Sequence, residues 1–158
     1  MSFLINPYIY GAVAKKLIAY YRLNGNSNDQ TSNNHDGTDT NITYVSGNSG
    51  DCAEFNGSTS DIAIPDHNDF SFTDGVGDLP FSLSCYFMKN TTKATDIHFL
   101  ISKLSSNSNK YEWQLYWTLS QFSFILRDNV DGGYIRVNHS ISISNSTWYH
   151  VVATSDGS

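Results

Sequence analysis

The polar tract that follows the first strand-like run carries residue types that could bind a metal ion. Residues 20–38, YYRLNGNSNDQTSNNHDGT, pass from two tyrosines and a leucine into almost nothing but Asn, Asp, Ser, Thr and Gly. Ca²⁺ takes about six to eight oxygen ligands from carboxylates, amides and carbonyls. The tract is therefore a candidate structural calcium site. The residues that could supply its oxygens are Asp29, Asn33, Asp36 and Asp39.

The spacing within the tract is not that of an EF-hand. Neither Asn24 nor Asp29 has a glycine five residues on or a glutamate eleven residues on. A run of Asn, Asp and Gly also lets side chains bond to their own backbone and lets residues adopt positive φ. We favour a hydrogen-bonded turn without a metal over the calcium site, with Asn24-Gly25 and Asp36-Gly37 marking turns at its ends.

Aromatic and amide side chains form a second candidate site, one for carbohydrate. Sugar rings stack on Trp and Tyr, while Asn and Asp bond the hydroxyl groups. In residues 111–117, YEWQLYW, strand alternation predicts a core-facing set made of Tyr111, Trp113, Leu115 and Trp117. The opposite face, together with nearby loops, is then an exposed patch. Its candidate residues are Tyr86, Gln114, Tyr116, Asn129 and Asp131.

Residues for other chemistry do not occur at the spacing that the chemistry needs. The chain has no G-x-S-x-G motif and no glycine-rich phosphate loop. Its five histidines include no i,i+4 pair and no C-x-x-C companion, so zinc is not expected. Trp148 is predicted to lie in the core, and His150 is predicted to be a satisfied packing residue and not a catalytic base. The sequence does not predict an enzyme.

Composition limits the partners. Nine Lys and Arg residues are scattered singly and the net charge is −6, so nucleic acid is not expected as a partner. No stretch approaches the 18 or so apolar residues that a membrane span needs. Cys52 and Cys85 both lie in strand-like runs, and they allow a disulfide without requiring one.

Short strand-like runs joined by turn residues extend along the chain. In FSLSCYFMK, residues 81–89, four apolar residues alternate with Ser, Tyr and Met, which indicates one core face. Asn56-Gly57 is a dipeptide that suits a hairpin between two short strands in 51–66. No convincing amphipathic helix is found, so the pattern predicts an all-β sandwich or barrel. The other expected strands are 17–23, 40–47, 97–104, 111–117, 121–128, 134–138 and 146–157.

The opening residues 1–16, MSFLINPYIYGAVAKK, are apolar but do not read as a cleaved signal. No Lys or Arg precedes the apolar run, and Pro7, Tyr8 and Tyr10 interrupt it. We expect an apolar arm that packs on a partner or on its own domain, followed by one β-sandwich domain over 17–158.

Four stretches in order match a family pattern. They are LIAYYRLNGNSNDQTSNNHDGT, GDCAEFNGSTSDIAIPD, FSLSCYFMK and STWYHVVATSDGS, and they run from Leu17 to the C-terminus. Together they resemble the laminin-G-like modules of the concanavalin A-like lectin/glucanase superfamily. The resemblance implies a jelly-roll β-sandwich of two antiparallel sheets, often with a structural calcium near the polar loop.

The chain departs from the family pattern at three places. Tyr86 stands where the family usually has Trp, and Ser155 stands where it usually has Tyr. The sequence also stops at Ser158, before the family's last strands, so we expect C-terminal strands to be missing. We favour a longer natural product over strands supplied by another chain, because an open core is costly.

The resemblance implies a non-catalytic recognition or adhesion module that binds a glycan or a surface. The glucanases of this superfamily use a pair of carboxylates on one strand, whereas Glu54 and Glu112 are far apart here. The opening residues resemble those of bacteriophage and other virion proteins, in which such domains decorate capsids, tails or fibres.

We therefore expect a location on a virion surface or outside the cell. The N-terminal arm would dock on other virion proteins, and the chain could form an oligomer. One alternative is a purely structural cement protein without glycan binding. The other is a glycan-cleaving enzyme, which the missing carboxylate pair disfavours.

Overall fold

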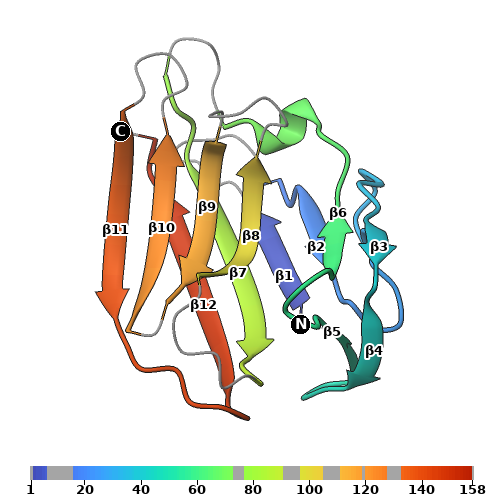
Figure 1. Ribbon diagram of the computed structural model, residues 1–158. Helices are drawn as coiled ribbons and strands as arrows, with labels where there is room; N and C mark the ends of the chain where they lie inside the picture. The colour runs from blue at the N-terminus through green and yellow to red at the C-terminus, as the bar shows by residue number, and fades with distance from the viewer. Residues whose placement is uncertain are drawn as a thin grey trace. The chain divides into compact units, whose positions relative to one another are not determined.

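The fold is all-β. The computed structural model describes residues 2–6, 16–72, 77–90, 97–104, 111–118, 120–127 and 133–157. Within these ranges the only helical element is the short 3-10 turn η1, Asn68–Phe70, and no helix is long and apolar enough to cross a membrane. The strands pair in antiparallel sheets (Figure 1), so the expected all-β class with antiparallel sheets is confirmed.

The chain divides into two compact units. The first comprises Met1–Met88 with Trp148–Ser158, and the second comprises Lys89–Thr147. Each unit contains a four-stranded antiparallel sheet, and the first also contains two short strand pairs.

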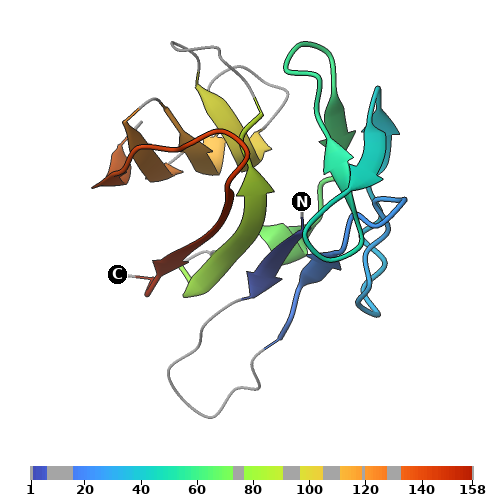
Figure 2. The same cartoon turned by 90° about the horizontal axis from the view of Figure 1, so that it is seen from below.

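The main sheet of the first unit is built around a strand with one buried face. Its order is β12-β7-β1-β2, and Figure 2 shows these strands from below. In β7 the apolar residues predicted to face the core are at most 3% exposed, which confirms the period-two pattern. The strands are β1 (Ser2–Asn6), β2 (Ala19–Tyr21), β7 (Phe81–Met88) and β12 (Trp148–Ser155).

Strand β1 comes from the segment expected as an N-terminal arm. Leu4 pairs with Tyr20 of β2 on one side and with Ser84 of β7 on the other. The first residues of the expected arm therefore lie in a sheet of their own unit, which was one of the two alternatives. Residues 7–15 lie outside the described ranges, and docking on another protein stays a prediction.

The two short strand pairs form one interrupted antiparallel ribbon. Its tip is the turn 47–50, where the Gly47 N–H donates to the Gly50 carbonyl at 2.8 Å and Gly50 adopts φ +87°. The register runs outward from this tip through β4 with β5 and then β3 with β6. The strands are β3 (Thr38–Thr40), β4 (Thr43–Ser46), β5 (Asp51–Glu54) and β6 (Asp61–Ala63).

The hairpin expected at Asn56-Gly57 is wrong, although both flanking strands exist. β5 pairs with β4 and β6 pairs with β3, so residues 55–60 form a loop within one side of the ribbon. Asn56 Oδ1 accepts hydrogen bonds from the backbone N–H groups of Ser58, Thr59 and Ser60 at 2.9–3.2 Å. The side chain thereby closes a wide local loop, and a two-residue hairpin turn does not form.

The sheet of the second unit has the order β11-β10-β9-β8. Thr118 N–H donates to the Gln121 carbonyl at 2.9 Å in the tight connection between β9 and β10. All seven residues of the edge strand β11 are exposed. The strands are β8 (His98–Leu104), β9 (Tyr111–Trp117), β10 (Gln121–Arg127) and β11 (Tyr134–Ser140).

Candidate functional site

Among the predicted carbohydrate-binding residues that the structure describes, Tyr86 on the outer face of β7 and β12 is the most exposed. Because strand side chains alternate, Tyr86 lies opposite the buried face of β7, and it is 46% exposed. Its neighbours on this face include Met88, which is 37% exposed, and Val152 of β12, which is 54% exposed. We call this surface the β7–β12 outer face. The residues on it are Ser82, Ser84, Tyr86, Met88, Trp148, His150, Val152 and Thr154.

A pair of stacked rings lies at the centre of this face. Tyr86 and His150 are cross-strand partners whose ring centroids are 4.2 Å apart, with 4° between the ring planes. The Nε2 atom of His150 is 2.8 Å from the Ser84 hydroxyl, a hydrogen bond that fixes the imidazole. The Tyr86 ring therefore has a defined orientation and a hydroxyl group close by, while much of its surface stays open.

The core position expected for Trp148 is wrong. Trp148 pairs with Met88 and so lies on the outer face, where it is half-buried. His150 was predicted to be a satisfied packing residue, and although it is exposed, its ring stacks on Tyr86 and bonds to Ser84. The register of β12 against β7 decides both positions, and a single strand's sequence does not contain that register.

The exposure expected of Gln114 and Tyr116 is wrong. Gln114 is 6% exposed and Tyr116 is 8% exposed. Their cross-strand partners Ile125 and Ser123 in β10 are also buried, so these four positions offer no open patch. The other two predicted sugar-binding residues, Asn129 and Asp131, lie outside the described residues.

The polar tract is a loop held together by one carboxylate. Asp29 is 8% exposed. Its Oδ1 accepts from the backbone N–H groups of Tyr20 and Thr31 at 3.0 and 2.9 Å. Its Oδ2 accepts from the Thr31 hydroxyl at 2.7 Å and from the His35 N–H at 3.1 Å. Burial raises the pKa of Asp29, but these hydrogen bonds outweigh burial and hold the pKa below its usual value.

The other three residues of the predicted calcium site have separate partners. Asp36 Oδ1 accepts from the Asp29 N–H at 2.9 Å, while Asp39 Oδ2 accepts from the Tyr44 hydroxyl at 2.7 Å. The Asn33 amide donates to the carbonyl of Ile18 at 2.7 Å. Within the described ranges these carboxylates do not converge on one point. The interpretation of the tract as a hydrogen-bonded turn is thus confirmed, and calcium binding stays untested.

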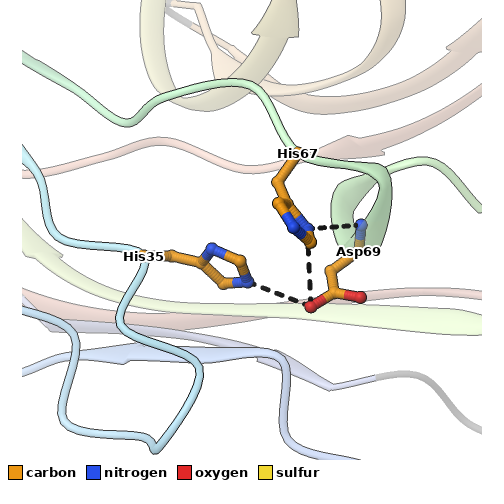
Figure 3. A group of neighbouring side chains, drawn as sticks. All are labelled: His35, His67 and Asp69. Carbon is orange, nitrogen blue, oxygen red and sulfur yellow. Dashed lines mark hydrogen bonds and ion pairs between the residues drawn. The ribbon is translucent and has the colours of Figure 1, made fainter.

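A different set of ligand atoms does converge in the first unit. His35, His67 and Asp69 each offer one ligand atom, and these atoms all lie within 4.8 Å of one another (Figure 3). His35 Nε2 is 3.1 Å from Asp69 Oδ2, and His67 Nδ1 is 3.5 Å from the same oxygen. The ammonium of Lys16 is also 3.4 Å from this oxygen. We call these three residues the His-His-Asp cluster.

The polar tract and η1 position the cluster from opposite sides. The backbone of His35 is fixed at both polar groups, since its N–H donates to Asp29 and its carbonyl accepts from the Tyr21 hydroxyl. Its ring packs against Phe70 of η1, with centroids 4.7 Å apart. Burial raises the pKa of the Asp69 carboxyl, but the neighbouring His35, Lys16 and His67 outweigh it and lower the pKa.

Sequence reasoning missed the His-His-Asp cluster. Zinc motifs are recognised by short spacings between ligands, and the only short spacing in this cluster is the His67-x-Asp69 pair. The third residue is 34 positions from Asp69 in the sequence.

The comparisons with known proteins give no family. A scan against models of protein families, a search of curated proteins and a search of solved structures each found no match.

Proposed function

We propose that this chain is a non-catalytic recognition module that binds carbohydrate through the β7–β12 outer face. The observation that carries the proposal is the exposed Tyr86 ring, which is held parallel to His150 at 4.2 Å. A sugar ring presents flat C–H faces that can lie on such an aromatic surface. The Ser84 and Thr154 hydroxyls on the same face supply hydrogen-bonding groups for the sugar hydroxyls.

The rigidity of the surface favours this function. Tyr86 and His150 lie on neighbouring antiparallel strands whose register is continuous over eight residue pairs. A ring fixed in this way loses little side-chain entropy when a ligand binds, which preserves affinity. The net charge of −6 favours a neutral glycan over a polyanionic one.

The resemblance to laminin-G-like modules is part of the same proposal. That family's jelly roll consists of antiparallel sheets, and an all-β chain of antiparallel sheets is compatible with it. Display on a virion or cell surface, with the chain's N-terminal segment near other particle proteins, is the setting in which such a module would act.

The test is a glycan array on the untagged full chain, followed by titration of each positive glycan. We expect Tyr86→Ala to weaken binding about tenfold, the loss expected for one aromatic contact worth about 1.5 kcal/mol. Tyr86→Phe should retain the affinity because it keeps the ring. The matched control is Tyr134→Ala, which removes a tyrosine that is 55% exposed on β11 and should leave binding unchanged.

Two results would contradict the proposal. One is the absence of binding to any glycan at millimolar concentration, both with and without Ca²⁺. The other is a glycan titration in which Tyr86→Ala and Tyr134→Ala behave alike, because the ligand would then not lie on Tyr86.

A further inference from the structure

We propose that the His-His-Asp cluster binds a divalent transition metal ion of the zinc class. This site is independent of the proposed carbohydrate surface, since it is formed by the polar tract and η1 and not by β7 and β12. Two imidazoles and one carboxylate are a ligand set that Zn²⁺ accepts, whereas Ca²⁺ prefers oxygen ligands alone.

Two of the three separations between the ligand atoms fit a tetrahedral ion, and the third lies within 4.8 Å. Zn–N and Zn–O bonds of about 2.0–2.2 Å place neighbouring ligands of a tetrahedron about 3.4 Å apart. Asp69 Oδ2 lies 3.1 Å from His35 Nε2 and 3.5 Å from His67 Nδ1. An ion between these atoms therefore requires only small movements of the side chains.

The orientation of His67 gives a second reason. Its Nδ1 accepts a hydrogen bond from the Asp69 N–H at 3.1 Å, which directs this nitrogen toward Asp69. The Asp69 Oδ2 atom is 3.5 Å from the same nitrogen. A small rotation of the His67 ring, which is 54% exposed, would direct Nδ1 to an ion bound by Asp69.

Lys16 supplies a cation at this position, and it would compete with a metal. Its ammonium is 3.4 Å from Asp69 Oδ2, and its side chain is 52% exposed. An exposed lysine can move into solvent at little cost, whereas the His35 ring is buried and held against Phe70. The metal would thus displace the mobile Lys16 ammonium, and its His35 ligand would already be in place.

A bound ion would fasten the polar tract to η1. His35 and Asp69 are 34 residues apart, so a shared metal closes a long loop within the first unit. Three protein ligands leave a fourth tetrahedral position for water. The ion would thus act as a clip between the polar tract and η1, with water in the fourth position.

The experiment is isothermal titration of ZnCl₂ into the untagged full chain after treatment with EDTA and dialysis. We expect saturable binding of one ion per chain and a melting temperature that rises with zinc concentration. Co²⁺ should bind at the same site and produce the visible absorption of a low-coordinate cobalt centre.

Variants separate this site from adventitious histidine binding. His67→Gln removes an exposed ligand and should weaken zinc binding more than about 100-fold, beyond the effect of losing an outer-shell partner. His139→Gln removes an exposed histidine of β11 and should leave the titration unchanged. Lys16→Met removes the competing ammonium and should strengthen zinc binding.

The proposal would be overturned by an EDTA-treated chain that shows no saturable zinc binding. It would equally be overturned if His67→Gln and His139→Gln reduced binding to the same extent, because zinc would then bind surface histidines in general. Far-UV circular dichroism of each variant verifies that a lost signal does not come from unfolding.

Discussion

Asp29→Asn tests whether one carboxylate organises the polar tract. The substitution keeps the side-chain shape and removes one negative charge. In the structure the carboxylate accepts four hydrogen bonds, three of them from backbone N–H groups. An asparagine can still accept two bonds through its oxygen, but its amide group would face the His35 N–H, donor against donor.

The expected loss of stability follows from these contacts. The Tyr20 and Thr31 N–H bonds change from charged to neutral acceptors, which costs about 1 kcal/mol each. The buried His35 N–H loses its acceptor, which costs at least about 1 kcal/mol more. We therefore expect Asp29→Asn to lower the free energy of unfolding by about 3 kcal/mol, a large share of a small unit's stability.

The measurement is equilibrium unfolding in urea, followed by tryptophan fluorescence and far-UV circular dichroism. Asp39→Asn is the matched control, since it removes the same charge from an exposed aspartate with the Tyr44 hydroxyl as its partner. We expect it to cost less than about 1 kcal/mol. If the two variants lost equal stability, Asp29 would not be the organising residue and the reasoning would be refuted.

Two further predictions concern the buried thiol of Cys85 and the close contact at Gly37, both in the first unit. Burial raises the pKa of Cys85 to about 12. In a Cys52→Ser background, labelling of Cys85 by a thiol reagent at pH 8 should therefore be more than about 1,000-fold slower in the folded protein than in urea, and it should accelerate as pH rises. Rapid labelling of the folded chain would contradict this. Gly37→Ala would place a Cβ 2.7 Å from Ile62 Cγ2, and it should lower the free energy of unfolding in urea by about 1–3 kcal/mol. The control Gly133→Ala has open space around its Cβ and should change stability by less than about 0.5 kcal/mol. Equal costs for the two variants would disprove the close contact.

Local pattern predicted most of the strands, but it missed β1 and did not give the strand partners. The alternation in residues 81–88 identified the buried face of β7, because a strand places every second side chain on the same side. Asn56-Gly57 was the strongest local hairpin signal, yet the ribbon turns at 47–50 instead. One Asn side chain can accept bonds from several backbone N–H groups and so close a wider loop. The Asn-Gly dipeptide alone does not show whether such a loop or a tight hairpin turn forms.

Burial on both faces of a strand was also beyond local pattern. Alternation in β9 correctly separated Trp113, Leu115 and Trp117 from Gln114 and Tyr116. It did not show that both sets are buried, because that depends on what covers each face of the sheet. Tyr86 was predicted as a binding residue and is exposed, and its partner His150 became apparent only from the register between β7 and β12.

The polar tract shows why a set of candidate ligands can mislead when it is taken from one segment. Asp29, Asp36 and Asn33 bond to the tract's own backbone and to the strand before it, so their oxygens and amides hold the loop in shape. The residue that this loop delivers to a shared site is His35, whose N–H is bonded to Asp29. Because Asp29 holds the His35 backbone, Asp29→Asn should weaken zinc binding as well as stability, although Asp29 would not touch the ion. Zinc titration of a variant that remains folded would therefore distinguish a positioning role for the tract from a purely stabilising one, which would leave the affinity unchanged.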